Sequence, residues 1–128
     1  MKVIIAGSRD ITDLRLLEKI MIDCPFNVSE VVCGGARGVD DLGRKWAGDK
    51  IPVRMFPANW DKFGKSAGYK RNTEMARYSD ALVLLWDGTS KGSKHMFDIA
   101  MERNMPIYLY RTDKGVRKLI NSPATLWG

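Results

Sequence analysis

Short apolar runs alternate with amphipathic stretches along almost the whole chain, and this alternation limits the folds that the chain can adopt. The apolar runs are rich in β-branched and aromatic residues and end at Gly, Pro or Asp, so each predicts a β-strand. They occupy residues 2–6, 30–33, 52–56, 81–86 and 107–110. The runs at 2–6 and 81–86 are almost continuously apolar, which is typical of central strands covered on both faces.

Four helical patterns separate the five predicted strands. The clearest lies in residues 39–47, where apolar side chains recur at intervals of three and four residues. The others cover residues 14–21, 68–79 and 96–100. This alternation predicts an α/β layered domain with a mostly parallel sheet of about five strands and right-handed crossovers.

The 128 residues fit a single domain. We expect this domain to span residues 1–110, followed by a C-terminal tail, residues 111–128, that packs on the domain or forms an interface. The tail contains Trp127 and, by its pattern, a short helix near residues 116–120. Residues 57–67 form the longest stretch without a pattern, and a loop of that length is usually functional or mobile.

Composition excludes several classes of protein. Hydrophobic residues make up 45% of the chain and charged residues 28%, as in a globular domain rather than a disordered chain. No apolar run approaches the roughly 18 residues of a membrane span, so we expect no membrane partner. The two cysteines form no CxxC pair and there is one histidine, which argues against a disulfide scaffold or a metal site. A reducing cytoplasm is the expected location.

The net charge of +6 favours an anionic partner, either a nucleic acid or a phosphorylated small molecule. Glycines, hydroxyls and cations follow the strands, and far fewer precede them. Ligands of open parallel sheets bind beyond the carboxyl ends of the strands, so this edge is predicted to hold an anion. The candidate ligand-binding residues are Gly7, Ser8, Arg9, Gly34, Gly35, Ala36, Arg37, Gly38, Asn59, Arg71, Asn72, Trp86, Gly88, Ser90, Gly92 and Ser93.

The loop at residues 34–38 is the strongest candidate for a phosphate site. Its glycines permit close backbone approach, the following helix start offers free N–H donors, and Arg37 can add a bidentate contact. Gly88 and Gly92 mark a second loop of this kind. The alternative interpretation is a tight strand-to-helix turn that binds nothing.

Other motifs point away from common nucleotide enzymes. Residues 64–66 resemble the end of a Walker A motif, but Asn59 stands where that motif needs a glycine, and no strand leads into it. The GxGxxG motif of dinucleotide-binding dehydrogenases is absent. Trp60 and Trp86 lie at candidate loops and either stack on a base or pack as rim residues. Trp46 is expected in the core, and His95 in solvent.

Four segments carry a resemblance to a known family: GSRD at 7–10, VVCGGARGVDDLGRKWA at 31–47, FPANWDKFGKSAGYKRNTEM at 56–75 and DALVLLWDGTSKGSKHMFDIA at 80–100. The sequence resembles the SLOG superfamily of DNA-processing and cytokinin-activating proteins, and within it the small YspA-like group of unknown function. The resemblance implies a Rossmann-like three-layer fold that binds a nucleotide-type small molecule. Members often occur in bacteria and phages, which would place a phage-encoded protein in the host cytoplasm.

In the cytokinin-activating branch, an Arg on the third helix and a Glu after a glycine-rich motif support hydrolysis of a nucleoside monophosphate. Arg71 matches that Arg, whereas Met96 stands at the Glu position. Asp40 and Glu74 are the other candidates for a catalytic carboxylate. The missing Glu weakens the enzymatic inference and leaves the binding inference intact.

Three functions follow from these observations. The first is a binding or sensing module for a nucleotide or an ADP-ribose-like ligand that requires no cofactor. The alternatives are a nucleotide N-glycosidic hydrolase and a nucleic-acid-binding protein with weak, non-specific affinity. The sequence leaves open whether the protein forms a homo-oligomer.

Overall fold

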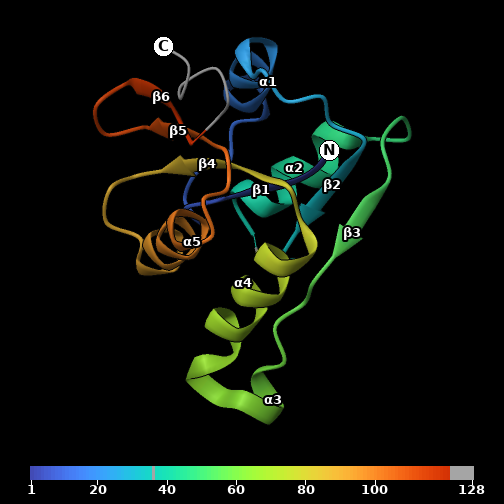
Figure 1. The fold of residues 1–128 in the computed structure, drawn as a ribbon, viewed down its shortest axis with the longest axis vertical. Coiled ribbons are helices and arrows are strands. Elements are labelled where there is room, and N and C mark those ends of the chain that lie inside the picture. Colours follow the sequence, from blue (N-terminus) through green and yellow to red (C-terminus); the bar gives the residue numbers. More distant parts are fainter. Residues whose placement is uncertain (36, 122–128) are drawn as a thin grey trace.

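The computed structural model of the protein describes residues 1–35 and 37–121, and it confirms the predicted α/β class (Figure 1). In chain order, the elements are β1 (Lys2–Gly7), α1 (Leu14–Asp23), β2 (Glu30–Cys33), α2 (Val39–Ala47), β3 (Val53–Met55), α3 (Trp60–Phe63), a 3₁₀ turn (Gly64–Ser66), α4 (Ala67–Tyr78), β4 (Ala81–Trp86), α5 (Lys91–Glu102), β5 (Ile107–Arg111) and β6 (Val116–Ile120).

The strands form one sheet in the order β3-β2-β1-β4-β5-β6. All neighbouring pairs are parallel except β5 and β6, which are antiparallel. The chain moves outward from β1 to β3 on one side and from β4 to β6 on the other. Strand order therefore reverses between β1 and β4, where a ligand site is expected in this class of sheet.

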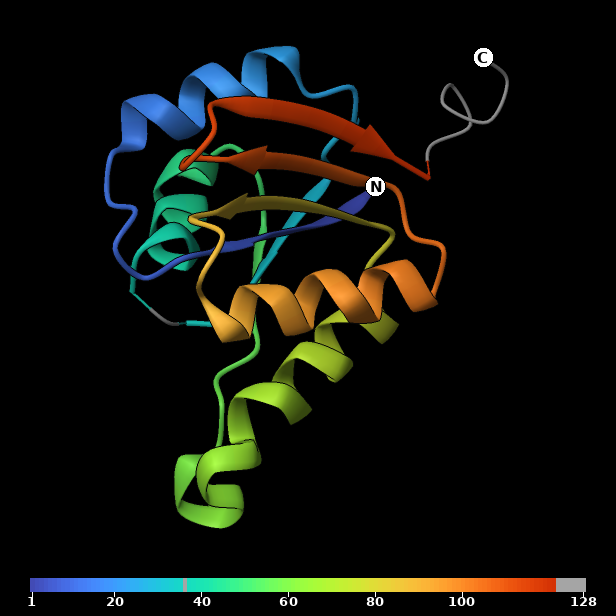
Figure 2. The same cartoon turned by 90° about the vertical axis from the view of Figure 1, so that its left-hand side faces the viewer.

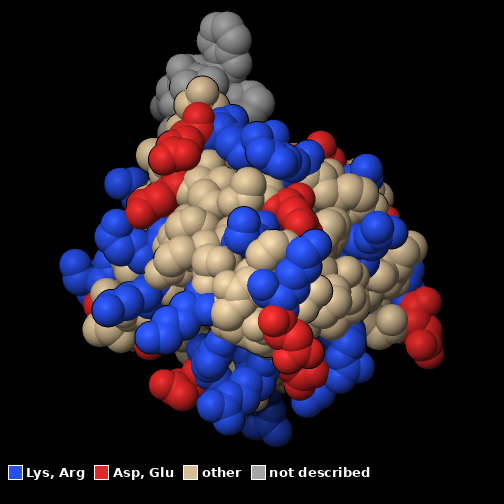
Figure 3. Space-filling view, turned by 90° about the horizontal axis from the view of Figure 1, so that it is seen from below, with Lys and Arg blue, Asp and Glu red and all other residues tan. Residues whose placement is uncertain are grey.

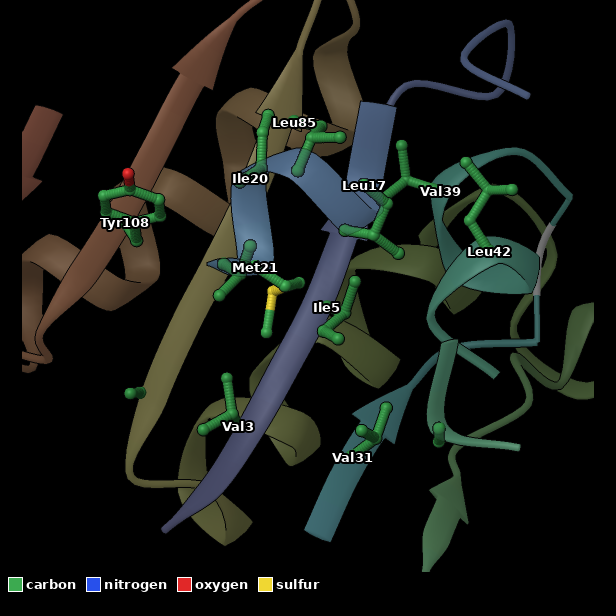
Figure 4. Close-up of a cluster of buried hydrophobic side chains, with 13 residues drawn as sticks. Val3, Ile5, Leu17, Ile20, Met21, Val31, Val39, Leu42, Leu85 and Tyr108 are labelled. Atoms are coloured by element: carbon green, nitrogen blue, oxygen red, sulfur yellow. The ribbon is translucent and has the colours of Figure 1, made fainter. Parts of the chain in front are cut away.

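Two helical layers cover the two faces of the sheet (Figure 2). Alternation along β1 divides its side chains between the layers: Val3 and Ile5 pack with α1 and α2, whereas Ile4 and Ala6 pack with α4 and α5. Figure 4 shows the first of these clusters, in which Leu17 and Ile20 of α1 lie over β1 and β4. The arrangement is the predicted Rossmann-like three-layer fold.

Two local predictions were wrong. Residues 116–120 form strand β6 rather than a short helix, because Gly115, at a φ of +64°, closes a hairpin that pairs Val116 with Arg111. The sheet therefore has six strands instead of about five. Residues 57–67 are not wholly irregular. Asn59 caps α3 by accepting a hydrogen bond from the Lys62 N–H, and the 3₁₀ turn follows directly.

Helix α4 extends beyond the sheet, and α3 lies at its far end, away from the layered body (Figure 1). Trp46 packs against the first core cluster, as predicted. Residues 122–128, including Trp127, lie outside the described residues, so the predicted packing of this part of the tail stays a prediction. No helix within residues 1–35 and 37–121 is long and apolar enough to cross a membrane.

Candidate functional site

A cavity of about 440 Å³ lies where strand order reverses, at the carboxyl ends of β1 and β4. This main cavity falls at the lower end of the roughly 300–1,000 Å³ range of small-molecule sites. Arg9, Arg37 and Arg71 reach it from the loops after β1 and β2 and from α4. Its other lining residues are Ala6, Gly7, Asp10, Asp40, Asn72, Met75, Asp87, Thr89, Ser90, Gly92, Ser93 and Met96.

Arg71 is held by the backbone of the β2–α2 loop. Its Nη1 donates to the carbonyl oxygen of Gly34 at 2.5 Å, and its Nε donates to Oδ1 of Asn72 at 3.1 Å. A Cβ atom at position 34 would collide with the guanidinium, so only glycine leaves room for this contact. Burial lowers the pKa of Arg71, and the nearby carboxylate of Asp40 opposes that shift. The side chain stays charged because an arginine pKa is far above neutral pH.

Asn72 is buried and links α4 to the start of α5. Its Nδ2 lies 3.3 Å from the carbonyl oxygen of Gly92, to which it donates, and 3.2 Å from Nδ1 of His95. The His95 ring also stacks on Tyr69, with the ring centroids 4.1 Å apart. Burial lowers the pKa of His95. The prediction of a solvated histidine was therefore only partly right, because the packing of α4 on α5 encloses part of the ring.

Asp40 is the buried carboxylate of the main cavity, with 6% of its surface exposed. It lies in the first turn of α2, where a negative charge is stabilised by the helix dipole. Burial raises the pKa of the Cys33 thiol to about 11, and the charge of Asp40 adds to this shift. Cys33 therefore stays protonated at neutral pH and cannot serve as a thiolate nucleophile.

The β4–α5 loop is held together by its own side chains. Oδ1 of Asp87 accepts hydrogen bonds from the N–H groups of Thr89 and Ser90, at 2.9 and 2.8 Å. These bonds lower the pKa of Asp87. The Ser90 hydroxyl caps α5 by accepting from the Ser93 N–H, and the buried Ser8 hydroxyl accepts from the Asp87 N–H.

The structure brings together most, though not all, of the sequence-predicted ligand residues. Those that line the main cavity are Gly7, Arg9, Arg37, Arg71, Asn72, Ser90, Gly92 and Ser93. Gly34 and Gly35 line an adjoining side hollow, described below. Ser8 and Gly38 support the loops: a Cβ at Gly38 would lie 2.5 Å from Cα of Arg9.

The remaining predicted residues lie elsewhere. Asn59 caps α3, and Glu74 is exposed on α4 outside the main cavity. Trp86 packs against Phe97 and under the Arg111 guanidinium, so the rim interpretation fits its surroundings better than base stacking does. Gly88 adopts a positive φ beside Arg111. Ala36 lies outside the described residues.

Sequence reasoning missed six lining residues: Ala6, Asp10, Met75, Asp87, Thr89 and Met96 were not proposed as ligand contacts. Asp10, Asp87 and Thr89 stand directly in the loops after β1 and β4, and this position was the available signal. Met75 and Met96 form an apolar wall. Their helical spacing cannot distinguish a core residue from one that also faces a cavity.

The described residues contain no group of three or more His, Cys, Asp or Glu side chains that could hold a metal ion. Figure 3 shows lysine and arginine side chains spread over the face that carries α3, with acidic side chains among them.

Comparison with known proteins agrees with this architecture. The model of the YspA, cpYpsA-related SLOG family matches residues 1–63. Among curated proteins, the Gene 61 protein of Mycobacterium phage D29 is 32% identical over 117 residues, which cover 83% of this chain and 93% of the phage protein. No solved structure matches the chain.

Proposed function

Because the chain belongs to the YspA, cpYpsA-related SLOG family, whose members point to a nucleotide-related function, we propose that its main cavity binds a nucleotide or nucleotide-derived phosphorylated ligand. The supporting observation is the convergence of Arg9, Arg37 and Arg71 on one cavity. Arg9 and Arg37 have no hydrogen-bond or ion-pair partner among residues 1–35 and 37–121, so they are available to an anionic ligand. In this proposal the protein acts as a binding or sensing module.

The three arginines differ in accessibility, and the difference suggests how each would act. Arg71 is largely buried and fixed by Gly34 and Asn72, so it offers a preorganised donor. Arg9 and Arg37 are exposed at the rim and can close on a phosphate that has entered. The carboxylates of Asp10, Asp40 and Asp87 suit the hydroxyl and amino groups of a nucleoside, to which they can only accept hydrogen bonds.

Calorimetric titration with the four common nucleoside monophosphates tests this proposal. We expect binding of at least one of them and a loss of about 1.5–3 kcal/mol in Arg9→Ala, the range for a hydrogen bond to a charged group. Arg44→Ala is the matched control, because Arg44 pairs with Asp41 on the surface of α2 and does not line the cavity. Equal losses in both variants, or no nucleotide binding at all, would contradict the proposal.

A second candidate function is hydrolysis of the N-glycosidic bond of a nucleotide, and the position of Asp40 favours it. A buried carboxylate beside the sugar can stabilise the positive charge that develops as this bond breaks. Met96 places a thioether in the same cavity and supplies no carboxylate. If wild-type protein releases free base from a monophosphate, Asp40→Asn should abolish the release. Glu74→Gln, on the exposed side of α4, should leave it unchanged.

A further inference from the structure

A second space adjoins the main cavity. This side hollow has a volume of about 260 Å³ and is lined by Arg9, Gly34, Gly35, Arg37, Pro57, Ala58, Trp60 and Arg71. Arg9, Arg37 and Arg71 line both spaces. These three arginines therefore lie where the two spaces meet.

The two spaces differ in chemistry. The main cavity combines the arginines with carboxylates, hydroxyls and an amide. The described lining of the side hollow contains no carboxylate: beside the arginines it holds glycines, Pro57, Ala58 and one aromatic ring, Trp60. Its volume lies below the roughly 300 Å³ at which separate ligand sites begin. It therefore fits one end of a longer ligand better than a ligand of its own.

Trp60 is placed to receive an aromatic ring. Its indole packs on α4 at Gly68, where a Cβ atom would lie 3.4 Å from Cη2 of Trp60 and 3.9 Å from Nη2 of Arg71. The indole therefore lies against the helix, and both Trp60 and Arg71 line the side hollow. Even so, 51% of the residue surface is exposed. A half-exposed indole that lies against a helix beside cations is a stacking surface for a base next to its phosphate.

From this arrangement we infer that the ligand is a two-ended molecule with a central pyrophosphate. One nucleoside occupies the main cavity, the pyrophosphate lies across Arg9, Arg37 and Arg71, and a second aromatic base stacks on Trp60. This inference rests on the proposed function, because it extends the same site. It names the class of ligand, a pyrophosphate-bridged dinucleotide, and assigns Trp60 to its second base.

The test compares nucleoside monophosphates with their pyrophosphate-bridged dimers. Diadenosine 5′,5″-diphosphate is titrated against AMP, and the guanosine dimer against GMP, in a calorimeter. We expect at least one dimer to bind ten-fold or more tightly than its monophosphate. Trp60→Ala should weaken dimer binding by roughly 5- to 100-fold, the contribution of one stacked base, and change monophosphate binding less than two-fold. Trp60→Phe, which keeps an aromatic face, should retain most of the dimer affinity.

Phe63→Ala is the matched control, since Phe63 is exposed on the same short helix and lines neither space. It should change neither affinity. If the monophosphates bind and the dimers gain nothing, or Trp60→Ala weakens both equally, the second subsite is refuted while the proposed function stands. If neither monophosphates nor dimers bind, both are refuted.

Discussion

The two glycine-rich loops beside the main cavity, at residues 34–38 and 87–92, resemble each other in sequence. They differ in whether side chains accept hydrogen bonds from their backbone N–H groups. In the β4–α5 loop, Asp87 accepts two backbone N–H groups and the Ser90 hydroxyl accepts a third. In the β2–α2 loop, Gly38 begins α2 without any side-chain cap. The N–H groups of Val39 and Asp41 have no acceptor within the described parts of the chain.

This difference shows that a glycine-rich loop before a helix is not by itself an anion site. Where aspartate and serine oxygens already accept the N–H groups, a phosphate would have to displace them. Where the cap is a glycine, the helix start keeps its donors. The cations follow the same division, since Arg37 of the first loop lines the main cavity and Lys91, the first residue of α5 after the second loop, does not. We therefore expect phosphate at the β2–α2 loop.

The largest effect is expected from a side chain added at the first of these loops. Gly38 has φ +78° and ψ −133°, and a Cβ there would lie 2.5 Å from Cα of Arg9. Gly38→Ala should lower the free energy of unfolding by about 3 kcal/mol, through backbone strain and steric clash, and should abolish nucleotide binding. Urea denaturation and calorimetry measure the two effects.

Gly92→Ala is the matched change at the second loop. A Cβ atom at Gly92 would meet nothing within 4 Å, and the position is helical. Its stability should stay within about 0.5 kcal/mol of the wild type, with any change in the stabilising direction. If Gly92→Ala abolished nucleotide binding in a folded protein, the phosphate would have to lie at the second loop.

The next effect separates the cations of the two loops. Arg37→Ala should weaken nucleotide binding by about 2 kcal/mol, because a charged hydrogen bond to phosphate is lost. Lys91→Ala removes an exposed cation outside the cavity and should change binding by less than about 0.5 kcal/mol. Calorimetric titration of both variants with the same nucleotide makes the comparison, and the reverse order would contradict it.

The fold could be predicted from the sequence where burial requires a recognisable pattern of apolar residues. Strands β1 and β4 are covered on both faces, so their residues are apolar almost without interruption. Strand β6 was missed because it lies at the sheet edge: Val116, Arg117 and Lys118 are exposed, and apolar and polar residues do not alternate along this segment. Gly115 was the remaining signal for a hairpin. Helix α3 has four residues, too few to show a helical period.

The residues of the site could be predicted where they lie in a loop that follows a strand. That rule located Arg9, Arg37 and the glycines of both loops. It could not show that Asp87 already occupies the N–H groups of its own loop, because this depends on the loop conformation. The rule also could not exclude Glu74 from the candidate catalytic residues. Glu74 lies one helical turn from Arg71, yet it is exposed on α4 outside the cavity.

A smaller effect is expected from the cap of the second loop. Asp87→Ala should cost about 1 kcal/mol of stability at pH 7, because the N–H groups of Thr89 and Ser90 lose their acceptor. The folded-state pKa of Asp87 is lowered by those bonds from an ordinary value of 3.8, so the carboxylate stabilises the fold above that value. This contribution is lost as the pH falls through the lower, folded-state pKa. The difference in the free energy of unfolding between Asp87→Ala and the wild type should therefore become smaller as the pH falls.

Asp87→Asn is the control for charge. Its amide oxygen can still accept both N–H groups, so it should lose less stability than Asp87→Ala and show a weaker dependence on acid. Urea midpoints measured from pH 7 down to pH 2.5 provide the comparison. A difference between Asp87→Ala and wild type that stayed constant down to pH 2.5 would show that the carboxylate does not hold the loop.

The smallest effect concerns His95, which connects the start of α5 to Arg71 through Asn72. Burial lowers the pKa of His95 below its ordinary value of 6.5, although Asp98 and Glu102 oppose this shift. The unfolded chain therefore takes up a proton at a higher pH than the folded chain does. The free energy of unfolding should have its full value above pH 6.5 and should decrease as the pH falls from there through the folded-state pKa.

His95 is the single histidine of the chain, so a change in stability between pH 7.5 and pH 5 that disappears in a variant without it is assigned to it. His95→Phe keeps a ring against Tyr69 but cannot titrate. We expect its urea midpoints at the two pH values to coincide, whereas those of the wild type separate. A protonated His95 also cannot accept the Asn72 N–H, so wild-type nucleotide affinity should fall over the same interval. An affinity that stays constant while stability falls would show that Gly34 alone positions Arg71.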